Sequence, residues 1–141
     1  MKQHSSLKKR CSHWHTWAEL LRLPNLFTVP GDVLVGWMLS GMRGGIPICS
    51  MVASLCFYAA GLLWNDVFDA SIDAKERPSR PIPSGRVSRM LVFLVGVGLA
   101  GVGLLLAWNG FSVALVLLGL ILFYNVLAKH IAWVGVITMG R

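Results

Sequence analysis

Three long stretches of this chain contain no Asp, Glu, Lys or Arg, and this absence constrains the fold more than any other feature. The stretches cover residues 46–64, 90–108 and 111–128. Each is close in length to the roughly 20 residues with which a helix crosses a bilayer core of about 30 Å. Only 13% of the chain is charged, against about 25% in a typical soluble domain. The sequence therefore predicts an integral membrane protein.

Two further apolar segments bear on the number of spans. Residues 24–42 form a fourth candidate, which Pro30 and Asp32 weaken. A fifth segment begins at Ile131 and stops at Met139, too short to cross a bilayer. Because the uncharged stretches have the length with which helices cross a bilayer, the expected fold is all-α. We expect a multi-pass transmembrane helix bundle of about four spans plus a truncated fifth.

Lys and Arg are distributed unevenly among the loops. Residues 1–23 carry five of them and residues 65–89 carry five more, whereas the loop between the first two spans has only Arg43. Basic residues gather on the cytoplasmic side of membrane proteins. We therefore expect a cytoplasmic N-terminus, with residues 1–16 basic and flexible, and a cytoplasmic segment 65–89, in the cell's inner (plasma) membrane. This distribution favours a lipid bilayer over nucleic acid as the partner of a chain with net charge +7.

Small residues recur on one face of the uncharged stretch 90–108. Gly96, Ala100 and Gly103 follow one another at helical spacing. Small side chains let transmembrane helices approach closely, so this face is predicted to pack against another helix. The short Asn109-Gly110 turn predicts that the two last spans are antiparallel neighbours. A lead-in helix over residues 17–23 is predicted before the first span.

Acidic residues are concentrated at the end of the second span. Four of the six in the chain fall within eleven positions: Asp66, Asp69, Asp73 and Glu76. If this span continues as a helix at about 100° per residue, Asn65 and the three aspartates lie in one sector. Phe68 and Ile72 are predicted to point elsewhere.

Like charges on one helical face repel each other, so a cation is expected beside them. The neighbouring Lys75, Arg77 and Arg80 can offset the charge in part. Carboxylate and amide oxygens are also what Mg²⁺ prefers, and Mg²⁺ usually completes its shell with water and substrate phosphate. The pattern therefore points to a magnesium-bridged phosphate or diphosphate. The alternative is a solvated charged cap at a helix end with ordinary cytoplasmic arginines.

The two segments of this cluster resemble a known motif. Residues 65–73 read N-D-V-F-D-A-S-I-D and residues 77–85 read R-P-S-R-P-I-P-S-G. Together they resemble the first aspartate-rich motif of the UbiA superfamily of intramembrane prenyltransferases. The sequence R-L-P-N at residues 22–25 is similar to the family's approach to its first helix, and Tyr124 and Lys129 resemble a tyrosine and a lysine of a later loop. The resemblance covers residues 17–141.

The resemblance implies an all-helical fold that holds an isoprenoid diphosphate through Mg²⁺. The implied metal ligands are Asn65, Asp66, Asp69 and Asp73, with Asp69 and Asp73 as the catalytic pair. The implied diphosphate-binding residues are Lys75, Arg77, Arg80, Tyr124 and Lys129. Pro81 and Pro83 would hold the loop extended over the site. Phe57, Tyr58, Trp64 and Phe68 can line the cavity, although packing is the commoner role of such aromatics.

The expected function is Mg²⁺-dependent transfer of a prenyl group from an isoprenoid diphosphate to an unidentified acceptor. No acidic residue follows Glu76, so the family's second aspartate-rich motif is lacking. We therefore expect residues 17–141 to be the N-terminal half of a longer enzyme and to be inactive alone. A natural half-protein that dimerises is the rival explanation.

Two other functions stay open at this stage. One is a non-catalytic relative that binds a lipid or polyprenyl phosphate, or that belongs to a transport or biosynthetic complex. The other is a small transporter or structural membrane protein.

Overall fold

The described part of the chain is built from helices. The computed structural model describes residues 14–42 and 44–128, and no strand occurs among them. Residues 14–21 are helical. The elements that follow are α2 (Leu23–Leu26), α3 (Val29–Leu39), α4 (Ile48–Glu76), α5 (Arg89–Leu106), the short 3₁₀ helix η1 (Trp108–Gly110), α6 (Phe111–Phe123) and the π-helical turn η2 (Tyr124–Ala128). The predicted all-α class is confirmed.

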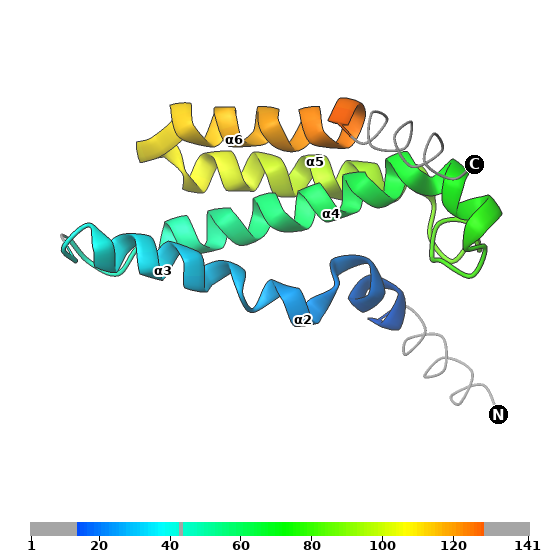
Figure 1. Cartoon of the computed structure of the whole chain (residues 1–141), viewed down its shortest axis with the longest axis horizontal. Coiled ribbons are helices and arrows are strands. Elements are labelled where there is room, and N and C mark those ends of the chain that lie inside the picture. The colour runs from blue at the N-terminus through cyan, green and yellow to red at the C-terminus, as the bar shows by residue number, and fades with distance from the viewer. Residues whose placement is uncertain (1–13, 43, 129–141) are drawn as a thin grey trace, which may run out of the picture.

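Three of the helical segments are long and apolar enough to cross a membrane. They are Ile48–Glu76, Arg89–Leu106 and Trp108–Val126, and they contain or largely cover the three uncharged stretches of the sequence. Figure 1 shows α4, α5 and α6 side by side, with α5 and α6 running in opposite directions on either side of η1. The predicted antiparallel pairing of the last two spans is therefore confirmed.

The fourth predicted span, residues 24–42, is not one continuous helix. It divides into α2 and α3, with a turn at residues 27 and 28. Pro30 stands in the first turn of α3. Proline lacks an N–H and its ring clashes with the carbonyl four residues earlier, which lies at the end of α2, so the helix ends and begins again there. The predicted fifth segment lies outside the described residues.

Helix α5 packs against α4 through its small residues, as the sequence predicts. Gly96, Ala100 and Gly103 are all buried. A Cβ atom added at Gly96 would lie 2.6 Å from Nε1 of Trp64, and one at Gly103 would lie 2.9 Å from Cε1 of Phe57. The two glycines therefore make room for two large aromatic side chains of α4, and close packing of this kind holds membrane helices together.

The lead-in helix and the loop between α4 and α5 lie at the same end of the bundle. The helix covers residues 14–21, where residues 17–23 were predicted. Its Leu20 is 1% exposed and packs in a cluster with Leu63 and Val67 of α4 and Val87 of the loop. Figure 1 shows both segments toward the right-hand end, while the α3–α4 turn and η1 lie at the left.

We predict that Gly96→Ala destabilises the protein by about 1–3 kcal/mol, because the added methyl group overpacks the contact with Trp64. The matched control is Gly98→Ala on the same helix, where an added Cβ meets nothing within 4 Å. This change should be neutral or stabilising, since alanine is the better helix former. Thermal unfolding of the detergent-solubilised protein compares the two variants. Equal melting temperatures would show that the α4–α5 contact is not tight.

Candidate active site at the end of helix α4

The aspartate-rich segment is a direct continuation of the membrane helix. α4 runs without a break from Ile48 to Glu76. The span therefore continues as a helix through the aspartates, as the prediction of a shared face required. Asn65, Asp69 and Asp73 line one cavity together. Ile72 lines the same cavity, and its predicted orientation was wrong. Seven residues make nearly two full turns of a helix at about 100° per residue, so Ile72 returns to the face of Asn65.

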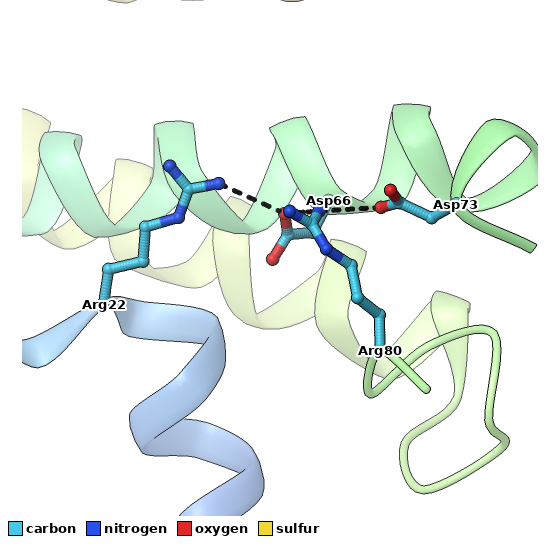
Figure 2. Close-up of polar contacts among 4 residues, drawn as sticks. All are labelled: Arg22, Asp66, Asp73 and Arg80. Carbon is cyan, nitrogen blue, oxygen red and sulfur yellow. Dashed lines mark hydrogen bonds and ion pairs between the residues drawn. The ribbon is translucent and has the colours of Figure 1, made fainter. Parts of the chain in front are cut away.

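Arg80 joins two of the carboxylates. Its Nη1 atom donates to Oδ2 of Asp73 at 2.7 Å and to Oδ1 of Asp66 at 3.4 Å, as Figure 2 shows. The two carboxylate side chains are only 9% and 12% exposed. A buried charge is costly unless it is paired, and this single guanidinium compensates two acidic side chains that lie nearly two turns apart on α4.

Arg22 approaches the same carboxylate pair from the other side. Its Nη2 atom lies 3.9 Å from Oδ1 of Asp66. The residue stands immediately before α2 with φ of 45° and ψ of 55°, in the left-handed region. Residues other than glycine rarely adopt this conformation, and such backbone strain clusters at functional sites. Sequence reasoning did not include Arg22 among the site residues, although the R-L-P-N segment had already been singled out.

The loop that carries Arg80 is compact. The prediction that Pro81 and Pro83 hold it extended was wrong, because residues 78–85 form consecutive turns and a bend. The backbone N–H groups of Arg86 and Val87 both donate to the carbonyl of Pro81. These hydrogen bonds fold the loop back on itself, and proline tolerates them because only its carbonyl is needed.

Arg86 fastens this loop at two points. Its Nη2 atom donates to the carbonyl of Ser79 at 2.6 Å, and its Nη1 atom pairs with the Glu19 carboxylate of the lead-in helix at 3.1 Å. One side chain therefore links the loop to the N-terminal helix. The guanidinium of Arg80 is held over α4 as a consequence.

Two cavities meet at the end of α4. The polar cavity, of about 240 Å³, is lined by Arg22, Asn65, Asp69, Ile72, Asp73, Glu76, Arg77 and Arg80. The apolar cavity, of about 480 Å³, lies between α4 and the end of α6 and is lined by Arg22, Phe57, Tyr58, Gly61, Leu62, Asn65, Leu120, Ile121, Tyr124 and Asn125. Arg22 and Asn65 line both. A ligand with a charged head and an apolar tail can therefore occupy the two cavities at once.

The remaining predicted site residues fall in different places. Tyr124 lines the apolar cavity, not the polar one. Lys75 is exposed on α4 and does not line the polar cavity. Lys129 lies outside the described residues. Among the aromatics, Phe57 and Tyr58 line the apolar cavity, whereas Trp64 packs against α5 and Phe68 is 37% exposed.

The polar cavity offers part of a magnesium site. Within the described ranges, no three His, Cys, Asp or Glu side chains converge as a complete metal-binding group. Asn65, Asp69 and Asp73 nevertheless present amide and carboxylate oxygens to one cavity. Mg²⁺ commonly uses one or two carboxylates and completes its shell with water and substrate phosphate. The donor set therefore fits a magnesium ion that a phosphorylated ligand shares.

Comparison with known proteins places this chain in a family. The model of the UbiA prenyltransferase family matches residues 29–140. A digeranylgeranylglyceryl phosphate synthase from Methanopyrus kandleri is 37% identical over 113 residues, which cover 77% of this chain and 41% of the relative. The protein of the same name from Natronomonas pharaonis is 32% identical over 123 residues, covering 83% and 44%. No solved structure matches the chain.

The chain thus spans less than half the length of these curated relatives. The family match nevertheless extends from α3 through all of the α4 and loop residues of the site, although not Arg22, and it covers well over half of the chain. Together with its three apolar helices, this match identifies the chain as an integral membrane protein that belongs to the UbiA prenyltransferase family.

Proposed function

We propose that the protein transfers a prenyl group from an isoprenoid diphosphate to a hydroxyl group of a glyceryl phosphate acceptor, with Mg²⁺ as cofactor. The observation that carries the proposal is the junction of a polar, arginine-containing cavity with a larger apolar one at the end of α4. A diphosphate head fits the first and an isoprenoid tail fits the second. The reaction is proposed for the whole protein, because this chain corresponds to less than half of its relatives.

The diphosphate is assigned to the polar cavity. Arg22, Arg77 and Arg80 line it, and guanidinium groups match phosphate oxygens through paired N–H donors. Asn65, Asp69 and Asp73 would hold Mg²⁺, which would neutralise the charge that develops on the leaving diphosphate. Asp66 is assigned a different role from the metal ligand that the motif implied. It pairs with Arg22 and Arg80 and serves as their counter-ion.

The prenyl chain is assigned to the apolar cavity. Phe57 and Tyr58 line it, and aromatic faces stabilise a neighbouring cation. When the bond between C1 of the prenyl group and the diphosphate oxygen breaks, the acceptor oxygen bonds to C1. The hydroxyl proton then leaves to an oxygen of the departing diphosphate. The apolar walls exclude water that would otherwise take the place of the acceptor.

The acceptor is assigned from the relatives' names. Their product name, digeranylgeranylglyceryl phosphate, describes a glyceryl phosphate that carries two geranylgeranyl groups. A prenylated glyceryl phosphate with a free hydroxyl is therefore the acceptor that we propose. Such a lipid is amphiphilic, and the arginines at the shared edge of the two cavities suit its phosphate.

We predict that Asp69→Asn combined with Asp73→Asn abolishes the Mg²⁺ dependence of diphosphate binding and weakens binding by roughly 10- to 100-fold, the size of one or two lost charged interactions. Calorimetric titration of the full-length protein with geranylgeranyl diphosphate, in Mg²⁺ and in EDTA, measures this effect. Asp32→Asn on α3 is the matched control and should bind as wild type does. An unchanged response to EDTA in the double variant would contradict the metal assignment.

We predict that Asp66→Asn lowers thermal stability while leaving the Mg²⁺ concentration for half-maximal diphosphate binding within about twofold of wild type. The stability loss should be about 1–3 kcal/mol, since a partly buried charged hydrogen bond is lost. Melting curves and magnesium titrations of the same preparation separate the two effects. A large shift in magnesium dependence would instead make Asp66 a metal ligand.

We predict that the N-terminal segment and the α4–α5 loop lie on the cytoplasmic side of the plasma membrane. The pairing of Arg86 with Glu19 supports placing the two segments on the same side. The concentration of Lys and Arg in both segments favours the cytoplasmic side. Ser79→Cys and Gly45→Cys, in a background with Cys11, Cys49 and Cys56 replaced, place single thiols at exposed positions of opposite loops. A membrane-impermeant thiol reagent should label the second from outside intact cells. Labelling of the first alone would mean the inverted orientation.

A further inference from the structure

The apolar cavity contains one polar side chain that is buried in its wall. Asn125 is 6% exposed and is one of three buried polar or charged residues in the described part of the chain, with Thr16 and Asp73. Of these three, Asn125 alone lines the apolar cavity. An amide in such surroundings is costly unless its donors and acceptors are hydrogen-bonded, so each end of this amide needs a partner.

Only one end of the amide is satisfied. Nδ2 of Asn125 donates to the carbonyl oxygen of Ile121 at 2.9 Å. Oδ1 is buried and has no hydrogen-bond partner. The amide cannot be turned over to remove this imbalance, because its oxygen would then face the Ile121 carbonyl and two acceptors would oppose each other. Oδ1 is therefore an acceptor without a donor. Because it is buried, a donor in the cavity reaches it only when the Asn125 side chain turns toward the cavity.

The local backbone explains why the side chain is in this position. Asn125 belongs to η2, a π-helical turn at the end of α6. The wider turn changes the angular position of residues that follow Phe123, compared with a continued α-helix. Such turns often occur at functional sites. Here the turn places Asn125 in a wall of the same cavity as Tyr58, Gly61 and Asn65 of α4.

The missing partner must be a hydrogen-bond donor. An ionised phosphate offers only acceptors, and a hydrocarbon chain offers neither donor nor acceptor. The hydroxyl of the acceptor is the one group in the proposed reaction that both donates a hydrogen bond and must lie near C1 of the prenyl group.

We infer that Oδ1 of Asn125 accepts a hydrogen bond from the reacting hydroxyl of the acceptor. This inference rests on the proposed function. An amide is too weak a base to take the proton, so Asn125 is a positioning residue that directs the oxygen lone pair toward C1 and leaves proton transfer to the diphosphate.

The experiment measures binding of two probes to the full-length protein. One is geranylgeranylglyceryl phosphate with its free hydroxyl, and the other is the analogue in which hydrogen replaces that hydroxyl. Both are titrated with Mg²⁺ and diphosphate present. Wild type should prefer the hydroxyl probe by about five- to tenfold, the size of one neutral hydrogen bond. Equal affinity of wild type for the two probes would overturn the inference without any variant.

Three variants then assign the preference to one residue. Asn125→Leu, of similar volume, should bind both probes equally. Asn125→Asp in its neutral form keeps a donor for Ile121 and a carbonyl oxygen for the ligand, so it should keep the preference. The control Asn109→Ala, at the exposed opposite end of α6, should behave as wild type. If Asn125→Leu still prefers the hydroxyl probe, the inference is overturned. If Asn125→Leu does not fold, the test passes to Asn125→Asp, and a folded Asn125→Asp that has lost the preference overturns the inference.

The proposed function fails in a different way. If wild type binds neither geranylgeranyl diphosphate with Mg²⁺ nor the hydroxyl probe, the prenyl-transfer assignment is wrong as a whole. If wild type binds both ligands but its preference for the hydroxyl probe does not depend on Asn125, only the positioning role is wrong. The two failures are therefore separated by the diphosphate titration alone.

Discussion

Helix α4 continues well beyond the length that the hydrocarbon core of a bilayer requires. Its 29 residues extend over about 43 Å at 1.5 Å per residue, against a core of about 30 Å. The excess carries the last turns, from Asn65 to Glu76, toward the aqueous side while keeping them on a helix that α5 holds firmly. The backbone of a membrane helix thus fixes the direction in which each functional side chain of this segment points. This rigidity is what allows Asn65, Asp69 and Asp73 to share one cavity.

Such an arrangement brings acidic groups together before any substrate is present, and their charge has to be compensated. Arg80 provides most of this compensation, with Arg22 at a longer distance. Under the proposed function the same guanidinium groups would turn from carboxylate to diphosphate when the substrate and its metal arrive. The exchange replaces one charged hydrogen bond by another of similar kind. The site is thereby held together without substrate and does not need a large rearrangement to accept it.

The sequence predicted those features that depend on local periodicity. The three uncharged stretches predicted the long helices, and the spacing of Gly96, Ala100 and Gly103 predicted the packing face of α5. The shared face of Asn65, Asp69 and Asp73 followed from the helical repeat, and Ile72 was misplaced only because that repeat was applied wrongly. That Arg80 offsets the carboxylate charge was also predicted and is confirmed. The contact of Arg22 was beyond such reasoning, because it depends on how a distant segment folds onto α4. The loop at Pro81 was misjudged for a related reason: proline restricts its own φ, but its carbonyl still accepts hydrogen bonds that close a turn.

Glycine sets the distances between helices on both sides of α4, with different results. On the α5 side, Gly96 and Gly103 admit the rings of Trp64 and Phe57, and the contact is filled. On the α6 side, a Cβ at Gly61 of α4 would lie 3.2 Å from Cγ2 of Ile121, so the two helices meet closely here. Phe57, Tyr58 and Asn125 nonetheless border an open cavity beside it. Close approach at Gly61 fixes the position of α6. The π-helical turn that follows α6 then places Asn125 in the wall of the cavity. The backbone of α6 therefore contributes to the site as directly as the aspartates of α4 do.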